Sequence, residues 1–305
     1  MEELKLNTIY NEDCLETMKK IKDKSVNLII ADFPYFEVKG DFDFIWKDFN
    51  EFLEWVEVCA KEFKRILSDN GSLYVYGHAK KIAYKQIIFD KYFNIENQIV
   101  WEKTVCQTKA YIDEFRSYAP IKEHILFYSQ NWDISSLERI EKEFIAPRNP
   151  FSFEIKKAMK KYNIKEIDFR RLRPSKTGGL TGWCSNIILG TSLPTKKDWI
   201  MLNELVKSSR TYEDLRKEYE DLRRPFNNKY KLEDVMKFDQ QSNITGKYDH
   251  PTQKPPKLSK ALIETSTRKG DLVYIPFGGS GVEVEQCQIL GLVWITGDLE
   301  KSIAI

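Results

Sequence analysis

The chain has 305 residues, which is enough for one large α/β domain and a smaller module. Its hydrophobic content of 42% and charged content of 31% are typical of a soluble globular protein. No apolar run approaches the roughly 20 residues that cross a bilayer, which argues against a membrane partner. Residues 1–5 lack the basic and then apolar plan of a secretory signal, so we expect a cytoplasmic protein.

The five cysteines predict neither a disulfide framework nor a metal site. They are odd in number, scattered along the chain, and never spaced as Cys-x-x-Cys. We interpret them as reduced thiols, mostly in the core. They are Cys14, Cys59, Cys106, Cys184 and Cys287.

The net charge of +2 is distributed unevenly along the chain. Residues 1–60 carry 7 lysines against 14 acidic residues, whereas residues 151–181 carry 9 basic residues against 3 acidic ones. This asymmetry predicts contact with a polyanion in the middle of the chain. The alternative is a solvated helix face with loop lysines.

The first predicted strand covers residues 6–13 and leads into a helix through Met18 and Ile21. Asp13 and Cys14 lie at the junction of the two elements. Asp13 can serve as the N-cap of that helix, as a ligand-binding carboxylate, or as both.

Residues 26–31 form a short, β-branched apolar run, which predicts a buried parallel strand. It ends at Asp32-Phe33-Pro34-Tyr35, where the proline stops the strand. Open α/β sheets bind ligands at the carboxyl ends of their strands. This arrangement suits a flat base that carries an exocyclic amine. The carboxylate and a backbone carbonyl could accept the two hydrogens of the amine, and the Tyr35 ring could stack on the base. The alternative is an ordinary proline turn.

The following segment continues the alternation of helices and strands. Asn50 is the predicted N-cap of a helix that ends at a left-handed cap on Asn70-Gly71. This alternation predicts a doubly wound, mostly parallel sheet. Further strands are predicted at 72–76, 95–101 and 124–129, with a helix at 79–90.

The alternation fails between residues 131 and 246. A basic, glycine-containing loop at 170–179 is the kind of segment that contacts phosphates. Thr195 with Asp198 predicts one capped helix, and Thr211 opens a second that ends at Arg223-Arg224. The two helices predict either a helix-turn-helix reader or a helical hairpin that supports the basic loop.

The α/β pattern returns near the C-terminus. The glycines at 278–281 would let the backbone approach a ligand, and the helix that follows would present its N-terminus. Asp298, about twenty residues later, is placed for ribose hydroxyls as in dinucleotide-binding folds. The predicted elements are a helix at 256–266, a strand at 271–277, a helix at 282–290 and a strand at 292–296.

Three segments in this order carry a family resemblance. Asp32-Phe33-Pro34-Tyr35 resembles the Asp-Pro-Pro-Tyr motif of amino-group DNA methyltransferases. Residues 250–255, His-Pro-Thr-Gln-Lys-Pro, are similar to a second segment of that family, and residues 276–281, Pro-Phe-Gly-Gly-Ser-Gly, to its S-adenosylmethionine loop. A catalytic motif that precedes the cofactor loop is the order of the β-type subfamily.

The resemblance implies a Rossmann-like methyltransferase domain with an inserted, mainly helical module. Residues 1–130 would be its catalytic half, 247–305 its cofactor-binding half, and 131–246 a target-recognition region. S-adenosyl-L-methionine would be the cofactor and double-stranded DNA the partner. A prokaryotic or phage origin, a homodimer and a cognate restriction endonuclease are compatible with it.

The resemblance also implies residue roles. Asp32 would accept a hydrogen bond from the amine of a flipped base, Pro34 would hold the turn, and Tyr35 would stack on that base. The implied cofactor-binding residues are Asp13, Cys14, His250, Thr252, Gln253, Lys254, Pro276, Phe277, Gly278, Gly279, Ser280, Gly281 and Asp298. The DNA-binding candidates are Arg170, Arg171, Arg173, Lys176, Arg223 and Arg224.

Asp at the first catalytic position favours adenine N6 as the target, since cytosine-N4 members more often carry Ser there. The sequence departs from the family at Phe33, which replaces a proline, and at Ile275, which replaces an aspartate. The chain also ends soon after Asp298. Cytosine N4 stays the alternative target, and these departures keep open a DNA-binding homologue with impaired catalysis. They also predict weak cofactor binding that Ile275→Asp would tighten.

Overall fold

The computed structural model forms two compact units, one of Met1–Trp132 with Arg224–Ile305 and one of Asp133–Arg223. We refer to them as the sheet unit and the helical unit. The structure describes residues 4–36, 45–103, 116, 118, 121–130, 149–174, 182–239 and 253–298.

The sheet unit is built on one eight-stranded sheet with the order β1-β8-β7-β2-β3-β5-β4-β6. All neighbouring strands are parallel except β5, which runs antiparallel to both β3 and β4. This confirms the predicted α/β class with a mostly parallel sheet. The strands are β1 (Thr8–Tyr10), β2 (Val26–Ala31), β3 (Leu67–Gly77), β4 (Phe93–Lys103), β5 (Lys122–Gln130), β6 (Val235–Phe238), β7 (Leu272–Ile275) and β8 (Val293–Gly297).

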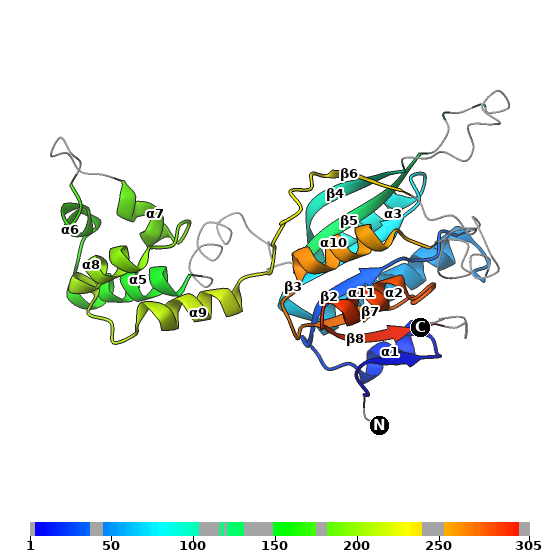
Figure 1. The fold of residues 1–305 in the computed structure, drawn as a ribbon, viewed down its shortest axis with the longest axis horizontal. Coiled ribbons are helices and arrows are strands. Elements are labelled where there is room, and N and C mark those ends of the chain that lie inside the picture. Colours follow the sequence, from blue (N-terminus) through cyan, green and yellow to red (C-terminus); the bar gives the residue numbers. More distant parts are fainter. Residues whose placement is uncertain are drawn as a thin grey trace. The chain divides into compact units, whose positions relative to one another are not determined.

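Helices cover both faces of this sheet (Figure 1). One face packs against α1 (Cys14–Lys20), α2 (Phe49–Ile66) and α3 (Ile82–Phe89) in a cluster that includes Met18, Phe63 and Phe89. The other face packs against α10 (Pro256–Ser266) and α11 (Val282–Ile289) in a cluster that includes Leu262 and Val284. The result is a three-layer α/β/α arrangement.

The N-cap of α2 differs from the prediction. Asp48, and not Asn50, caps this helix, because its carboxylate accepts the backbone N–H groups of Asn50 at 2.9 Å and Glu51 at 3.0 Å. Asn50 is therefore already inside the first turn. A carboxylate at the N-cap also interacts favourably with the positive end of the helix dipole.

The predicted left-handed cap at Asn70-Gly71 is wrong. The helix α2 ends at Ile66, Leu67 is extended, and the chain passes directly into β3. The pairing of β2 with β3 jumps from Val26↔Leu67 to Leu28↔Ser72, so the extra residues form a bulge. Gly71 lies in that bulge, where a Cβ atom would come within 2.6 Å of the Leu67 side chain. The glycine permits close packing and does not terminate a helix.

The helical unit has its own apolar core, centred on Phe151, Trp199 and Leu202. The predicted capping pair of Thr195 with Asp198 is confirmed at the start of α8, and Thr211 opens α9 as predicted, where it too forms a capping box, with Asp214. The helices are α5 (Pro150–Tyr162), α6 (Glu166–Arg171), α7 (Trp183–Leu189), α8 (Lys196–Val206) and α9 (Tyr212–Leu222).

The helical unit is shorter than the predicted middle region of residues 131–246. Residues from Arg224 onward belong to the sheet unit, and β6 extends the sheet by pairing with β4. None of the described helices is both long enough and apolar enough to cross a membrane. Among the described residues, no group of three or more His, Cys, Asp and Glu side chains could hold a metal ion.

Candidate active site

Asp32 follows β2 directly and is held by a buried lysine. The ammonium of Lys254 lies 2.8 Å from Asp32 Oδ2, and the Lys254 side chain is only 5% exposed. Burial by itself lowers the pKa of Lys254, but the carboxylates of Asp32 and Glu123 raise it well above its ordinary value. Lys254 is therefore a permanent cation beside the predicted catalytic carboxylate.

Tyr35 joins the same polar group. Its hydroxyl donates toward Asp32 Oδ1 at 3.1 Å and toward Glu123 Oε2 at 3.0 Å, and it accepts from Lys254 Nζ at 3.1 Å. Burial raises the pKa of Tyr35 well above its ordinary value, and the two carboxylates raise it further. Tyr35 is therefore neutral, and these hydrogen bonds fix the orientation of its ring.

Glu123, at the start of β5, completes the group. Its Oε1 pairs with Lys103 Nζ at 2.7 Å, and its Oε2 lies 3.4 Å from Lys254 Nζ. Burial by itself raises the pKa of Glu123, but the two ammonium groups lower it to about 2. The four side chains form an alternating series of charges, Lys103, Glu123, Lys254 and Asp32, which we call the charge chain.

Phe33 occupies an aromatic pocket beneath the catalytic turn. Its side chain is 1% exposed, and its ring lies 4.9 Å from the ring of Phe277, centroid to centroid. The buried ammonium of Lys85 lies 4.9 Å from the Phe33 ring and 3.4 Å from the carbonyl oxygen of Pro34. Three further rings line the pocket, those of Trp55, Phe63 and Phe89. Phe33, which stands where the family motif has proline, thus fills this pocket with its ring.

The glycine loop after β7 is attached to the end of β8. Gly278 N donates to the Gly297 carbonyl at 2.9 Å, and Gly279 N donates to Asp298 Oδ2 at 2.7 Å. Gly279 and Gly281 have positive φ values of 46° and 75°, which side-chain-bearing residues rarely adopt. The loop therefore requires glycine at these two positions.

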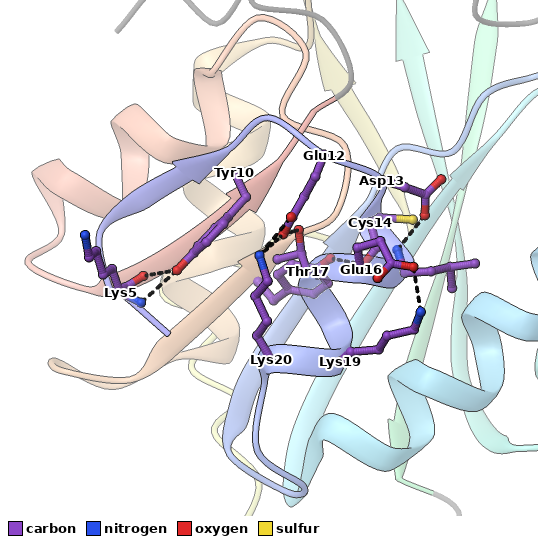
Figure 2. Close-up of polar contacts among 11 residues, drawn as sticks. Lys5, Tyr10, Glu12, Asp13, Cys14, Glu16, Thr17, Lys19 and Lys20 are labelled. Atoms are coloured by element: carbon purple, nitrogen blue, oxygen red, sulfur yellow. Dashed lines mark hydrogen bonds and ion pairs between the residues drawn. The ribbon is translucent and has the colours of Figure 1, made fainter. Parts of the chain in front are cut away.

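Asp13 lies at the end of β1, next to β8 on the same edge of the sheet. Its Oδ1 accepts the backbone N–H of Leu15 at 2.7 Å, which confirms its role as N-cap of α1. Figure 2 shows Asp13 at the start of α1, apart from the Glu12–Lys20 ion pair. Asp13 and Asp298 thus follow the two strands on one side of β7, the strand that leads into the glycine loop. This set of groups fits a cofactor with an amine, hydroxyls and a carboxylate.

The remaining predicted cofactor residues are buried or partly buried, or lie outside the described residues. Cys14 is buried in the core, Gln253 is 8% exposed, and His250 and Thr252 lie outside the described residues, as does Lys176, a predicted DNA-binding residue. Pro276 and Ser280 are buried parts of the loop, and Phe277 packs on Phe33. Ile275 is 1% exposed and belongs to the apolar cluster beneath α10 and α11, so its side chain packs in the core.

The predicted DNA-binding arginines have intramolecular partners. Arg170 pairs with Glu166 at 2.9 Å, and Arg173 with Asp198 at 3.2 Å. Further pairs are Arg171 with Asp168, Arg223 with Glu220, and Arg224 with Glu96, the last also stacked on Phe127.

Sequence reasoning missed Glu123, Lys103 and Lys85. Lys85 had a signal, since it lies three residues after Ile82 and four before Phe89 on the buried face of α3. Glu123 and Lys103 had none, because only the pairing of β4 with β5 brings them together. Lys254 was predicted as a cofactor ligand, whereas the structure places its ammonium on Asp32.

Comparison with known proteins agrees with this geometry. The sequence profile of the N6/N4 methyltransferase family, described as DNA methylase, matches residues 26–304. The type II methyltransferase M.HinfI of Haemophilus influenzae is 38% identical over 115 residues, which is 32% of this chain and 32% of that protein. The DNA adenine methyltransferase YhdJ of Escherichia coli K12 is 25% identical over 90% of this chain and 71% of its own.

A solved structure shares the fold. The complex of M1.HpyAVI with S-adenosylmethionine aligns with a TM-score of 0.51 and 17% identity over 96% of this chain and 94% of that one. The match of the family profile over most of the chain, together with the fold, establishes that the chain belongs to the DNA methylase family.

Proposed function

We propose that this protein transfers a methyl group from S-adenosylmethionine to the N6 amine of adenine in duplex DNA. The observation that carries the proposal is Asp32, a carboxylate fixed by Lys254 at 2.8 Å and placed beside the glycine loop through the Phe33–Phe277 contact. The target base would leave the stack and enter this site. The Asp at the first catalytic position and the similarity to YhdJ both favour adenine.

The chain's own groups would act mainly by positioning. When bound, S-adenosylmethionine supplies an electrophilic methyl group. Asp32 would accept a hydrogen bond from the amine, which directs the nitrogen lone pair, and would hold the proton that the amine releases after the transfer. Tyr35 would present its ring to the base while its hydroxyl stays fixed. Asp13, residues 278–281 and Asp298 would hold the cofactor.

We assign the helical unit to DNA contact, and within it we give the lysines of α5 the main role. Lys157, Lys160 and Lys161 are exposed at a spacing that places them on one side of α5, and they form no ion pair with any described residue. The helix α9 carries five acidic and two basic residues, which disfavours it as a recognition helix. The helical-hairpin interpretation of α8 and α9 is the better supported one.

Identification of the methylated nucleoside tests this function. The protein is incubated with labelled cofactor and mixed unmethylated DNA, and the DNA is digested to nucleosides. Label in N6-methyladenine supports the proposal. Label in N4-methylcytosine would show that cytosine, and not adenine, is the target base. Asp32→Ala should abolish incorporation but retain DNA binding, because phosphate contacts supply most of the affinity.

The rival is a DNA-binding homologue without turnover. It is favoured by the Lys254 ammonium, which already binds Asp32 Oδ2. It predicts DNA binding with no incorporation of label under any condition, in the parent protein as well as in Asp32→Ala.

A further inference from the structure

The catalytic turn, which runs from Asp32 to Phe36, ends in a strained backbone conformation. Phe36 has a φ of 57°, in the left-handed region that a bulky side chain rarely adopts. Its side chain is 5% exposed, and its ring packs on those of Phe49 and Phe52. Strained backbone persists only where surrounding groups fix it, and it occurs often at functional sites. Contacts from the rest of the sheet unit must therefore hold this turn.

Two lysines, one at the N-cap of α3 and one a turn later, contact the backbone of the catalytic turn. Lys81, the N-cap residue, donates to the carbonyl oxygen of Phe36. Lys85 donates to the carbonyl oxygens of Pro34 at 3.4 Å and of Tyr76 at 3.2 Å. Because the two lysines are four residues apart, they lie on the same side of the helix. Lys85 also ties the turn to β3, the strand that contains Tyr76.

The same ammonium groups lie over aromatic rings of the turn. Lys81 Nζ is 4.8 Å from the centroid of the Phe36 ring. Lys85 Nζ is 4.9 Å from the centroid of the Phe33 ring and 5.5 Å from that of the Tyr35 ring. A cation at such a distance is attracted to the face of a ring. Each lysine therefore contacts the turn through both a carbonyl oxygen and a ring.

Neither lysine is a residue that the stability of α3 alone would favour. Lys81 forms no side-chain capping bond, although the N-cap position favours Ser, Thr, Asp or Asn. A cation there also faces the positive end of the helix dipole, and the first turn of α3 carries no acidic residue to offset it. Lys85 is 2% exposed, and an ammonium group is costly to bury. Two residues that weaken their own helix yet contact the same turn indicate a functional constraint on that turn.

We propose that Lys81 and Lys85 are positioning residues that hold the catalytic turn, and with it Asp32 and Tyr35, in the conformation that receives the target base. This inference rests on the proposed function. Lys254 fixes the carboxylate of Asp32, whereas the two lysines of α3 fix the backbone that follows it. Neither lysine of α3 takes part in a chemical step.

The kinetic test separates the contact with the turn from the charge. Lys81→Met removes the donor and keeps a side chain of similar length, whereas Lys81→Arg keeps a donor. Lys80→Met is the matched control, because Lys80 is the exposed neighbour of Lys81 and loses the same charge. Single-turnover rates of methyl transfer to mixed unmethylated DNA are measured with saturating S-adenosylmethionine. Calorimetry measures the binding of that cofactor to each variant.

Lys81→Met should lower the single-turnover rate by roughly tenfold, because small displacements of positioned groups reduce the rate strongly. The pair variant, Lys81→Met with Lys85→Met, should lower it by roughly a hundredfold. Cofactor affinity in Lys81→Met should stay within about twofold of the parent, since the lysines act on the turn and not on the cofactor. Lys81→Arg should recover most of the rate, and Lys80→Met should match the parent. An equal loss in Lys80→Met, or a loss of cofactor affinity in step with the rate, overturns the proposal.

A second measurement needs no turnover, so it decides the proposal even if the parent transfers no methyl group and the proposed function fails. Crystal structures of the parent and the pair variant are compared. In the pair variant, Phe36 should leave the left-handed region, and the Asp32 carboxylate should move by about 1 Å, a displacement large enough to slow the reaction. If Phe36 keeps its positive φ and the two turns superimpose, the lysines do not hold the turn. Lys81→Met alone, at a partly buried site, serves the same comparison at Phe36 if the pair variant does not fold.

Discussion

The rings of Phe33 and Phe277 lie in contact at 4.9 Å and join the catalytic turn to the glycine loop. Phe33 belongs to the segment that carries Asp32, and Phe277 immediately precedes Gly278. The contact therefore couples Asp32, the proposed acceptor of the amine, to the loop that we propose holds the methyl donor. Proximity catalysis depends on this kind of alignment, because small displacements of the reacting groups reduce the rate.

Phe33→Ala should destabilise the sheet unit by about 3–5 kcal/mol, because it empties a pocket lined by four rings and Lys85. Urea unfolding of the two proteins measures the difference. Phe153→Ala is the matched control, since that ring is 57% exposed, and it should change the unfolding free energy by less than about 1 kcal/mol. Equal effects of the two variants would contradict the packing described for Phe33.

Ile275→Asp should destabilise the protein and should not tighten cofactor binding, contrary to the expectation from sequence. The side chain is 1% exposed among apolar groups, so a carboxylate there would lack solvent and cost about 2 kcal/mol or more. Ile275→Val, the control, should cost about 0.5–1.5 kcal/mol. Urea unfolding and calorimetric titration with S-adenosylmethionine separate the two effects. Tighter binding without lost stability would restore the original expectation.

The stabilising contribution of Glu123 should be lost in acid. Its pKa falls from an ordinary 4.5 to about 2 in the folded state, so its contribution is complete above pH 4.5 and is lost as the pH falls toward 2. The contribution is about 3 kcal/mol at most. Glu123→Gln should flatten the dependence of the unfolding free energy on pH in this window. Glu204→Gln, at an exposed site, should leave that dependence as steep as in the parent.

Replacement of Lys157, Lys160 and Lys161 by alanine should weaken binding to all duplexes alike. Each lost phosphate contact should lower the logarithmic salt slope by roughly one unit. The matched set Arg170, Arg171 and Arg173 should have the smaller effect, because these guanidinium groups already pair with Glu166, Asp168 and Asp198. Fluorescence anisotropy at several salt concentrations measures both sets. If replacement of the arginines weakens binding more than replacement of the lysines, the basic loop at 170–179 makes the main DNA contact.

Features set by neighbouring residues were predictable from sequence. The capping boxes at Thr195 and Thr211, the bounds of α10, and the position of Asp32 after β2 all depend on a few adjacent side chains. The Asn70-Gly71 pair misled the prediction, because the same residues suit a helix cap and a β-bulge. Only the register of β3 against β2 distinguishes the two.

The charge chain could not be predicted, because its members come from four separate segments. Lys103 and Glu123 lie on neighbouring strands, and Lys254 precedes α10, more than two hundred residues after Asp32. Sequence similarity marked Lys254 as part of a motif but did not indicate its partner. Contacts of this kind depend on sheet order and on the direction of β5, which periodicity does not reveal.

The pairing of β1 with β8 has a consequence for the order in which the protein is made. The strand β1 at Thr8–Tyr10 pairs with β8 at Val293–Gly297. This pair, which precedes Asp13 and Asp298, can therefore form only after nearly the whole described chain has been synthesised. Contacts between such distant residues slow folding. A nascent chain would therefore complete the edge that carries Asp13 and Asp298 among its last steps of folding.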